Sequence, residues 1–294
     1  MRRPTVEALV AAGLDPAYVE DVIRRALAED LAGGVDVTSV ATVPAGQAGT
    51  ARLVARAAGV LAGLPVAAAV FDVAAGGSVQ LGLSMKDGTE VGPGDVLGTV
   101  AGPTRALLTA ERTALNLLCH LSGVATATRA WADALAGTGV AVRDTRKTTP
   151  GLRALERYAV RCGGGRNHRL GLSDAALVKD NHVLAAGGVV AAFEAVRHRF
   201  PGVPVEVECD RVEQVREVVA AGADLVLLDN MTLAELAESV RAARAVRPDV
   251  RLEASGGLTL AAARAVAQTG VDYLAVGALT HSATVLDIAL DLRE

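Results

Sequence analysis

The stretch VPVEVECDRVEQVREVVAAGADLVLLDN, residues 203–230, decides the fold class. It places two short apolar runs, VPVEVEC and DLVLLDN, on either side of the amphipathic pattern RVEQVREVVAAG. Continuous apolar strands that alternate with amphipathic helices are typical of βα units, whose parallel sheet is buried on both faces. The stretch therefore predicts an α/β protein with a parallel sheet.

The same pattern runs through the second half of the chain. Apolar runs occur at residues 140–145, 174–180, 203–209, 224–230, 250–257 and 271–278. In βα barrels the chemistry lies at the carboxyl ends of the strands. The residues at these ends are polar or glycine, namely Thr145, Lys179, Glu208, Asp229, Ser255 and Gly277. A complete barrel needs two further strands, so an incomplete barrel is a real alternative.

The first part of the chain has a different pattern. Residues 15–30 predict an amphipathic helix, with Asp15 as its N-cap and Pro16 at its first position. Strand patterns broken by Gly and Pro follow at 50–63, 77–83 and 95–102. Residues 104–135 predict a helix with a break near Ser122 and Gly123. These patterns indicate a smaller α+β domain ahead of the barrel.

Composition narrows the class of protein. The chain has 294 residues and a formal net charge of -4, which argues against general nucleic-acid binding. No apolar stretch approaches the ~20 residues of a membrane span. The apolar run near the N-terminus is too short for a signal peptide, which predicts a cytoplasmic protein without membrane contact.

The cysteines and lysines are few. The three cysteines, Cys119, Cys162 and Cys209, are widely spaced, so neither a disulfide nor a zinc site is expected. Cys162 is either a nucleophile or, more simply, a small buried residue. Only Lys86, Lys147 and Lys179 are lysines among 29 Lys and Arg. Lys86 fits a solvated hairpin better than the hairpin of a biotin or lipoate carrier.

A concentration of basic residues marks the candidate site. Residues 143–180 hold nine bases, including Arg146, Lys147 and Arg169, against four acids. Guanidinium groups grip carboxylates and phosphates with two parallel hydrogen bonds. The pattern predicts that the ligand is a small polyanion.

Two acids and two glycine-rich turns lie at neighbouring strand ends. Glu208 and Asp229 could accept hydrogen bonds from a sugar, hold Mg²⁺ or stabilise a cationic transition state. Alternatively, they pair with nearby arginines. The turns at 254–257 and 276–282 could cradle phosphate with backbone N–H groups. Together these features predict a ribose phosphate, a second anion and Mg²⁺.

At these residues the sequence resembles the quinolinate phosphoribosyltransferase family. The matching motifs include ERTALNLLCHLSGVAT, EVEC, LLDN, EASGG, VGALTHS and the long stretch DTRKTTPGLRALERYAVRCGGGRNHRLGLSDAALVKDNH. The resemblance implies an N-terminal α/β sandwich domain at 1–118 and an open, incomplete βα barrel of six or seven strands at 119–283. It leaves the tail at 284–294 free to pack back on the first domain. It also implies a homodimer with shared active sites, or a trimer of such dimers.

The resemblance also implies roles for individual residues. Arg105 would complete the partner's site, while Arg146, Lys147, His168, Arg169 and Lys179 would line the pyridine dicarboxylate and the phosphates. Glu208 and Asp229 would face the ribose and its Mg²⁺. The 5-phosphate would lie against Ser255, Gly256, Gly257, Val276, Gly277 and Ala278, with His281 beside it. Lys147, Lys179, Glu208 and Asp229 would carry the catalysis, and Thr145, Thr148 and Thr149 would position an anion or cap the next helix.

The implied reaction transfers a phosphoribosyl group from phosphoribosyl pyrophosphate to quinolinate, with loss of CO₂, and gives nicotinate mononucleotide for NAD synthesis. His168 or His281 is either a general acid or a neutral hydrogen-bonding residue, whereas His120, His182 and His198 are expected to be structural. Two rival functions stay open. One is a related phosphoribosyltransferase with another acceptor, such as the homologue encoded at molybdenum loci, and the other is a sensor of ribose phosphates without activity.

Overall fold

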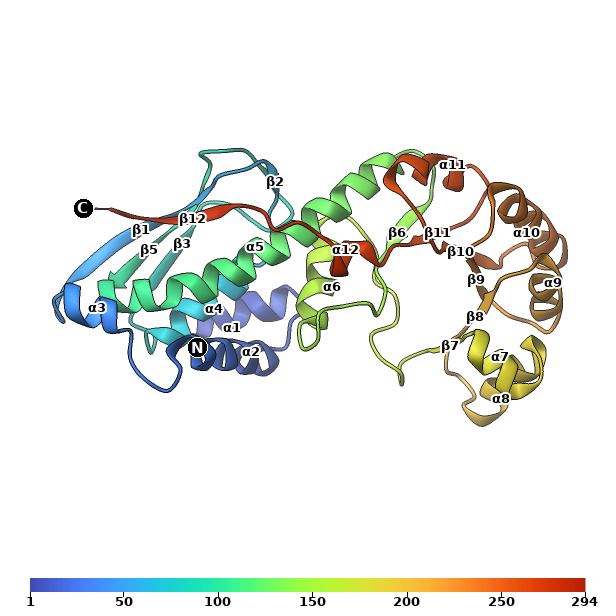
Figure 1. Ribbon diagram of the computed structural model, residues 1–294, viewed down its shortest axis with the longest axis horizontal. Coiled ribbons are helices and arrows are strands. Elements are labelled where there is room, and N and C mark those ends of the chain that lie inside the picture. The colour runs from blue at the N-terminus through green and yellow to red at the C-terminus, as the bar shows by residue number, and fades with distance from the viewer. Residues whose placement is uncertain (294) are drawn as a thin grey trace. The chain divides into compact units, whose positions relative to one another are not determined.

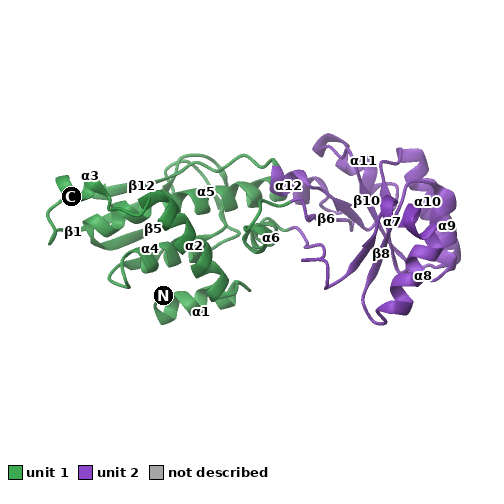
Figure 2. Cartoon of the chain, turned by 60° about the horizontal axis from the view of Figure 1, so that its bottom comes forward, with its two compact units in different colours: residues 1–129, 148–164, 282–294 green, residues 130–147, 165–281 purple. Residues whose placement is uncertain are grey.

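The computed structural model describes residues 1–293, and the chain forms two compact units (Figure 2). The first unit contains Met1–Arg129, Thr148–Gly164 and the segment from Ser282 onward. The second unit contains Ala130–Lys147 and Gly165–His281. The chain therefore leaves the first unit, enters the second, and returns twice.

The first unit combines helices with antiparallel strands. A four-stranded sheet has the order β12-β1-β5-β3, and β2 pairs with β4 in a separate ribbon (Figure 1). Leu53, Phe71, Leu97 and Leu118 are buried, so the core lies between the sheet and the helices. The elements of this unit are α1 (Arg3–Ala11), α2 (Pro16–Leu31), α3 (Val37–Thr42), β1 (Ala48–Ala55), β2 (Gly59–Val60), α4 (Leu64–Ala74), β3 (Gln80–Leu83), β4 (Glu90–Val91), β5 (Val96–Pro103), α5 (Thr104–Ala134, up to Arg129), α6 (Arg153–Cys162) and β12 (Ile288–Arg293).

Local sequence signals set the helix starts in this unit. The Asp15 side chain accepts a hydrogen bond from the Ala17 N–H at 3.0 Å, and Pro16 begins α2, as predicted. The first turn of α4 is capped from a distance, because Asp87 accepts the N–H groups of Gly63 and Leu64 at 2.8 and 3.1 Å. Lys86, next to that cap, is exposed in the loop between β3 and β4.

The predicted break near Ser122 and Gly123 is wrong, because α5 is continuous from Thr104 to Ala134. Gly123 has another role. A Cβ at this position would collide with the carbonyl oxygen of Thr284 and the backbone of Val285. The glycine therefore lets the C-terminal segment pass directly over the helix.

The predicted domain boundary after residue 118 falls inside α5, whereas the compact units divide after Arg129. Residues 148–164 also belong with the first unit, because α6 packs on α5. His120 Nε2 on α5 lies 2.8 Å from Glu156 Oε1 on α6, and a Cβ on Gly163 would collide with α5 at Ala125 and Thr128. The C-terminal tail contains β12, which pairs antiparallel with β1, while Glu294 lies outside the described residues.

The second unit holds a parallel six-stranded sheet with the order β6-β11-β10-β9-β8-β7. All six predicted strands are present. Figure 1 shows a curved sheet with helices on its outer side. The elements are β6 (Ala141–Arg143), β7 (Ala176–Val178), α7 (Asp180–Ala186), α8 (Val189–Arg199), β8 (Val205–Cys209), α9 (Val212–Ala220), β9 (Leu225–Asp229), α10 (Leu233–Val246), β10 (Arg251–Ser255), a 3₁₀ turn (Leu260–Ala262), α11 (Ala263–Ala267), β11 (Tyr273–Ala275) and α12 (Ala278–His281).

This sheet is open, because β6 and β7 are its two edges and do not pair with each other. The prediction of an incomplete barrel is therefore confirmed, with six strands. Val207 on β8, Val226 on β9 and Val215 on α9 are all buried, as expected for a parallel sheet covered by helices.

Strand register decides which side chains face the inside of the open barrel. Glu206 aligns with Leu225, and Glu208 and Glu253 both align with Leu227. Side chains that align across neighbouring strands point to the same face. Glu206, Glu208, Glu253 and Ser255 therefore share the inward face. Within β8, Glu208 lies two residues closer to the carboxyl end than Glu206, and within β10, Ser255 lies two residues closer than Glu253.

Among residues 1–293, no helix is long and apolar enough to cross a membrane.

Candidate active site

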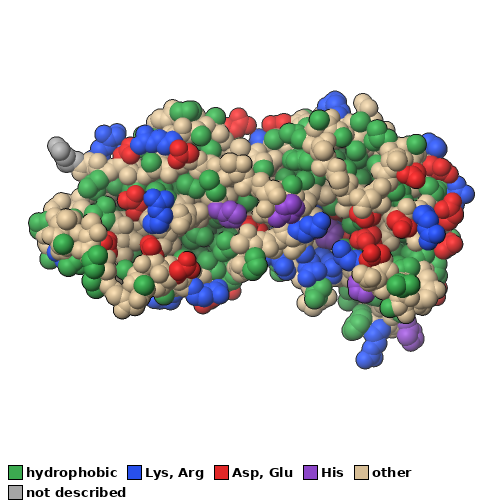
Figure 3. Space-filling model, in the orientation of Figure 1, with side chains coloured by type: hydrophobic (Ala, Val, Ile, Leu, Met, Phe, Trp, Pro, Cys, Tyr) green, Lys and Arg blue, Asp and Glu red, His purple; other side chains and the backbone are tan. Residues whose placement is uncertain are grey.

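A pocket of about 650 Å³ opens at the carboxyl ends of the parallel strands. Of the predicted site residues, all except Arg105, Thr148 and Thr149 line it. These are Thr145, Arg146, Lys147, His168, Arg169, Lys179, Glu208, Asp229, Ser255, Gly256, Gly257, Val276, Gly277, Ala278 and His281. The remaining lining residues are Leu177, Leu227, Asn230, Leu258 and Ala275. In Figure 3 basic and acidic side chains lie next to one another on the surface of this second unit.

Two arginines in the pocket carry buried donors without partners. The Nε atoms of Arg146 and Arg169 are buried, and neither has a hydrogen-bond partner within the described chain. Burial, with the nearby charge of Arg146, lowers the pKa of the Arg169 guanidinium. Buried donors that lack partners are costly. An anion placed between the two guanidinium groups would remove both costs.

Lys147 is held by contacts along its length. Its carbonyl oxygen accepts a hydrogen bond from the Thr280 hydroxyl at 2.8 Å, and the Thr280 side chain is buried. A Cβ on Gly277 would lie 2.9 Å from Lys147 Cδ and 3.2 Å from His281 Nε2. Gly277 therefore leaves room for the lysine stem, which lies beside His281. No ion pair of the Lys147 ammonium is found in residues 1–293.

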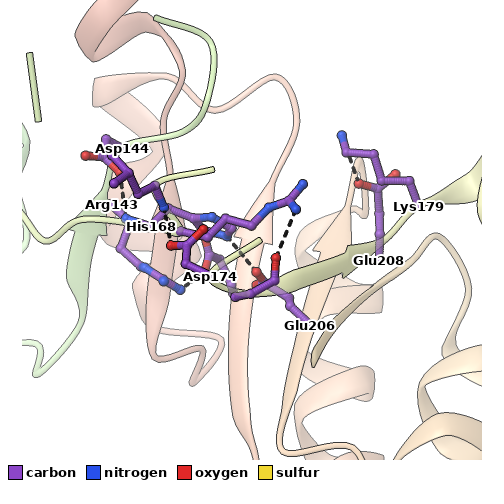
Figure 4. A network of polar contacts seen from close by, with 11 residues as sticks. Arg143, Asp144, His168, Asp174, Lys179, Glu206 and Glu208 are labelled. Carbon is purple, nitrogen blue, oxygen red and sulfur yellow. Dashed lines mark hydrogen bonds and ion pairs between the residues drawn. The ribbon is translucent and has the colours of Figure 1, made fainter. Parts of the chain in front are cut away.

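The two predicted acids lie in the same pocket but have different neighbours. Lys179 Nζ is 3.7 Å from Glu208 Oε2 (Figure 4). Partial burial raises the pKa of Glu208; Lys179 opposes this rise and Asp229 adds to it. Asp229 Oδ2 accepts a hydrogen bond from Asn230 Nδ2 at 2.6 Å, which fixes its orientation. Glu208 and Asp229 therefore present carboxylate oxygens to the same cavity.

Asn230 also shapes the first glycine-rich turn. It adopts a left-handed conformation (φ 55°), and its N–H donates to the Ser255 carbonyl at 2.9 Å. Gly256 has a φ of +88°, and a Cβ there would collide with the Asn230 side chain. Only glycine fits this position, so Asn230 and Gly256 together fix the turn that follows β10.

One step deeper on the same strands lies a second group of charges. His168 Nε2 is 2.6 Å from Glu206 Oε2 and 3.9 Å from Glu253 Oε1, and Arg143 pairs with Glu253 Oε2. His168, Glu206 and Glu253 are buried. Figure 4 shows this cluster as separate from the pair formed by Lys179 and Glu208. His168 therefore belongs to both the pocket wall and the buried cluster.

The loop that carries His168 is anchored through Asp144. The Asp144 side chain accepts the His168 N–H at 2.6 Å and the Asn167 side-chain amide at 2.6 Å. Arg143 also lies over the Tyr273 ring, 4.8 Å from its centre. Burial lowers the pKa of His168. A neutral imidazole is therefore the favoured form in this environment.

Comparisons with known proteins match this architecture. A sequence profile described as the C-terminal domain of quinolinate phosphoribosyl transferase matches residues 124–291, and its N-terminal domain profile matches residues 36–122. The nicotinate-nucleotide pyrophosphorylase (carboxylating) of Mycobacterium leprae (strain TN) is 54% identical over 92% of this chain and 96% of its own length.

The chain belongs to the quinolinate phosphoribosyltransferase family.

Solved structures carry the same family fold. The crystal structure of NadC from Streptococcus pyogenes is 39% identical, with a TM-score of 0.89 over 96% of this chain and 99% of that one. The nicotinate-nucleotide pyrophosphorylase from Francisella tularensis is 35% identical, with a TM-score of 0.90 over 95% and 98%. The family's two-domain fold is thus shared along nearly the whole chain.

Some residues predicted for this family site lie elsewhere. Arg105, in the first unit, donates from Nε to the Val43 carbonyl at 2.7 Å and from Nη2 to the Val40 carbonyl at 3.0 Å. Cys162 belongs to the first unit and does not line the pocket, and burial raises the pKa of its thiol to about 11, which disfavours the reactive thiolate. His120 pairs with Glu156, and His182 Nδ1 accepts the Lys179 N–H at 2.9 Å, so both have structural contacts.

The structure adds residues that the sequence analysis of this family member missed. Arg143, Glu206 and Glu253 form the buried cluster, Asn230 orients Asp229, and Thr280 holds Lys147. A signal for the acids was present. Glu206 precedes Glu208 by two residues, and Glu253 precedes Ser255 by two. In a strand that spacing places both members of a pair on one face.

Proposed function

We propose that the pocket at the strand ends is where this enzyme joins quinolinate to the ribose of phosphoribosyl pyrophosphate. The family's reaction gives nicotinate mononucleotide, pyrophosphate and CO₂ in NAD synthesis. One observation supports the pocket most strongly. The buried Nε donors of Arg146 and Arg169 have no partner in the described part of the chain, and both arginines line the cavity together with Lys147 and Lys179. A pyridine dicarboxylate supplies the acceptor oxygens that these donors need.

Glu208 and Asp229 would stabilise positive charge that develops on the ribose. The ring nitrogen of quinolinate attacks the anomeric carbon with its lone pair, while the bond from that carbon to pyrophosphate breaks and its electrons leave with the pyrophosphate. The anomeric carbon gains positive charge during this exchange. Carboxylates fixed beside it stabilise that charge without having to reorganise. Glu208, near Lys179, and Asp229, oriented by Asn230, fit this role.

Loss of CO₂ would follow the transfer. When the bond to the carboxylate next to the nitrogen breaks, its electron pair stays on the ring carbon. A quaternised nitrogen stabilises that pair as an ylide, and the carbon then takes up a proton. A neutral ring offers no such stabilisation. The basic groups near the pocket, Lys147 above all, would orient the departing carboxylate in a fixed position.

The turns after β10 and β11 would hold the 5-phosphate. Ser255, Gly256 and Gly257 line one side of the pocket, and Val276, Gly277 and Ala278 line another. Backbone N–H groups near glycine approach a phosphate closely, because no Cβ blocks them. His281, beside Gly277, would complete this part of the pocket.

The residues fit a role for Mg²⁺, which we include in the proposal. Mg²⁺ prefers oxygen ligands and is usually held by one or two carboxylates together with substrate oxygens and waters. Glu208 and Asp229 offer such oxygens to one cavity, and no third acid lines it among the described residues. The ion would neutralise charge on the diphosphate when both are bound.

We also propose that the working unit is a dimer in which Arg105 serves the pocket of the partner. Two facts support this proposal. Arg105 belongs to the first unit, and every described lining residue of the pocket belongs to the second. Mixing Arg105→Ala with Lys147→Ala tests this idea, because a mixed dimer has one site with both defects and one with neither. Recovered activity supports sharing; no recovery after proven subunit exchange contradicts it.

The function is tested by comparing acceptors. The purified protein is given phosphoribosyl pyrophosphate and Mg²⁺ with either quinolinate or nicotinate. We expect nicotinate mononucleotide and CO₂ from quinolinate, and little or no product from nicotinate. Pyrophosphate release only with another acceptor would favour the related transferase, and binding without any release would favour a sensor.

A further inference from the structure

The buried cluster below the pocket holds more acid than base. Glu206 and Glu253 are both buried, and Arg143 is the cation that pairs with Glu253. His168 contacts Glu206, and its ring is neutral when burial dominates. Two buried carboxylates therefore share one directly paired guanidinium, that of Arg143, and the charge of Arg169 also acts on Glu206. Buried charges are normally matched by opposite charge or removed by a proton.

The hydrogen bonds of the cluster also show more acceptors than donors. Glu206 Oε1 and Glu253 Oε1 are buried, and neither accepts a hydrogen bond from any donor in the described residues. The two carboxyl groups also contact each other closely enough for a hydrogen bond. Two carboxylates cannot form that bond, because both only accept. A single proton between them would satisfy both oxygens.

A metal ion is a poorer explanation of the cluster. His168, Glu206 and Glu253 each have one ligand-type atom within 4.8 Å of the others. However, two ligands bound at about 2.1 Å to one ion at a right angle lie about 3 Å apart. The 2.6 Å contact between His168 Nε2 and Glu206 Oε2 is shorter and fits a hydrogen bond. Arg143 also occupies the other oxygen of Glu253.

We propose that Glu253 is a positioning residue, kept as a neutral carboxylic acid that donates a hydrogen bond to Glu206 and thereby fixes His168 in the pocket wall. Its chain of contacts is short. Glu253 contacts the Glu206 carboxyl group, and Glu206 Oε2 contacts the His168 ring. The proposed proton rests on the burial of the two acids and on their two carboxyl oxygens without partners in the described residues. Its consequence for quinolinate binding rests on the proposed function.

The electrostatic surroundings agree with this assignment. Burial, with the adjacent Glu206 carboxylate, raises the pKa of Glu253 to about 8, while Arg143 and His168 oppose the rise. Asp144 and Arg169 are the other charged groups that act on His168, and Tyr273 lies under Arg143. The pKa of Glu253 is higher in the folded protein than in the unfolded chain. Its contribution to stability is therefore complete below pH 4.5 and lost as the pH rises toward 8.

Glutamine imitates the proposed state, because it is neutral, keeps the shape and donates from its amide. We expect Glu253→Gln to keep kcat/KM for quinolinate within about threefold of the wild type at pH 7. Above pH 8 the wild type should lose kcat/KM as Glu253 ionises, and the variant should lose less. Glu253→Leu, which donates nothing, should raise KM for quinolinate about tenfold or more, the scale of one lost buried hydrogen bond.

An infrared spectrum tests the proton without any turnover. The wild type at pH 7 should show the C=O band of a protonated carboxyl group, and Glu253→Gln should lack it. The proposal is overturned if that band is missing from the wild type, or if both proteins have the same pH profile. It is also overturned if Glu253→Gln is as impaired as Glu253→Leu. If Glu253→Leu does not fold, the infrared spectrum and the pH profile of Glu253→Gln still test the proposal. Failure of quinolinate turnover in the wild type would instead contradict the proposed function.

Discussion

Two layers of charge lie on the inward face of the same parallel sheet, and they are neutralised in different ways. The outer layer contains Glu208, Asp229 and the cations of the pocket wall, and it is open to a cavity of about 650 Å³. The inner layer contains Arg143, Glu206 and Glu253, which are largely or fully buried and contact one another. A shift of two residues along a strand separates the layers.

The difference shows how position sets the role of a charge. In the outer layer, the buried Nε donors of Arg146 and Arg169 have no partner among residues 1–293, and the nearest cation of Glu208 is Lys179 at 3.7 Å. A bound ligand can complete these contacts. In the inner layer no ligand enters, so each charge must find its partner inside the protein. Substitutions in the outer layer should therefore reduce activity, and those in the inner layer should first reduce stability.

The largest effect is expected from removing the inner cation. Arg143→Met deletes the cation that pairs with buried Glu253 and should lower the free energy of unfolding by about 3–5 kcal/mol. The matched outer substitution, Lys179→Met, should cost less than about 1 kcal/mol, since that ion pair is half-exposed. Urea unfolding of both variants at pH 7 measures the contrast. Equal losses of unfolding free energy in the two variants would contradict the claim that the inner layer contributes more to stability than the outer layer.

The next effect is on turnover. Lys147→Ala removes an exposed ammonium from the pocket and should lower kcat by about 10²-fold or more, on the scale of a lost transition-state contact. Its free energy of unfolding should stay within about 0.5 kcal/mol of the wild type. Steady-state kinetics and urea unfolding measure both quantities. Near-normal turnover would remove Lys147 from the catalytic group.

A smaller effect is expected when the shape of a cation changes but its charge does not. Arg146→Lys or Arg169→Lys should weaken quinolinate binding about tenfold, because an ammonium cannot replace a planar fork. Arg199→Lys, on an exposed part of α8, is the matched control and should bind as the wild type does. Isothermal titration with quinolinate makes the comparison. Unchanged quinolinate binding by both pocket variants would contradict the proposal that each arginine binds a carboxylate with two parallel hydrogen bonds.

The smallest effect concerns a support of the outer layer. Thr280→Val removes the hydroxyl that bonds to the Lys147 carbonyl and should lower kcat/KM about fivefold, the scale of one hydrogen bond. Thr280→Ser keeps the hydroxyl and should restore most of the activity. If serine and valine behave alike, the packing of the side chain matters and the hydrogen bond does not.

Much of the outer layer could be predicted from the sequence, because each strand end carries its own signal. An apolar run that stops at Lys179, Glu208 or Asp229 marks both the strand and the pocket residue. The six strands followed from the same runs, which left an incomplete barrel as an alternative, and the family resemblance implied the open barrel. The helix from Pro16 was also predictable, because a cap and a proline act locally.

The contacts of the inner layer and the boundaries of the compact units could not be predicted from local sequence signals. Glu253 lies within an apolar run, and nothing local shows that it contacts Glu206, which is 47 residues earlier and two strands away in the sheet. Gly123 suggested a helix break, but its reason is the distant backbone at Thr284. Likewise, residues 148–164 join the first unit through contacts between α5 and α6. Each of these features depends on residues far apart in the chain.

The most direct test of the account follows the carboxylate that leaves. The wild type is given Mg²⁺, phosphoribosyl pyrophosphate and quinolinate labelled with ¹³C in the carboxylate next to the ring nitrogen. The account predicts equal amounts of labelled CO₂, pyrophosphate and nicotinate mononucleotide, and no labelled CO₂ when phosphoribosyl pyrophosphate is omitted. Labelled CO₂ without phosphoribosyl pyrophosphate, or undiminished release by Lys147→Ala, would contradict transfer and decarboxylation at this pocket in that order.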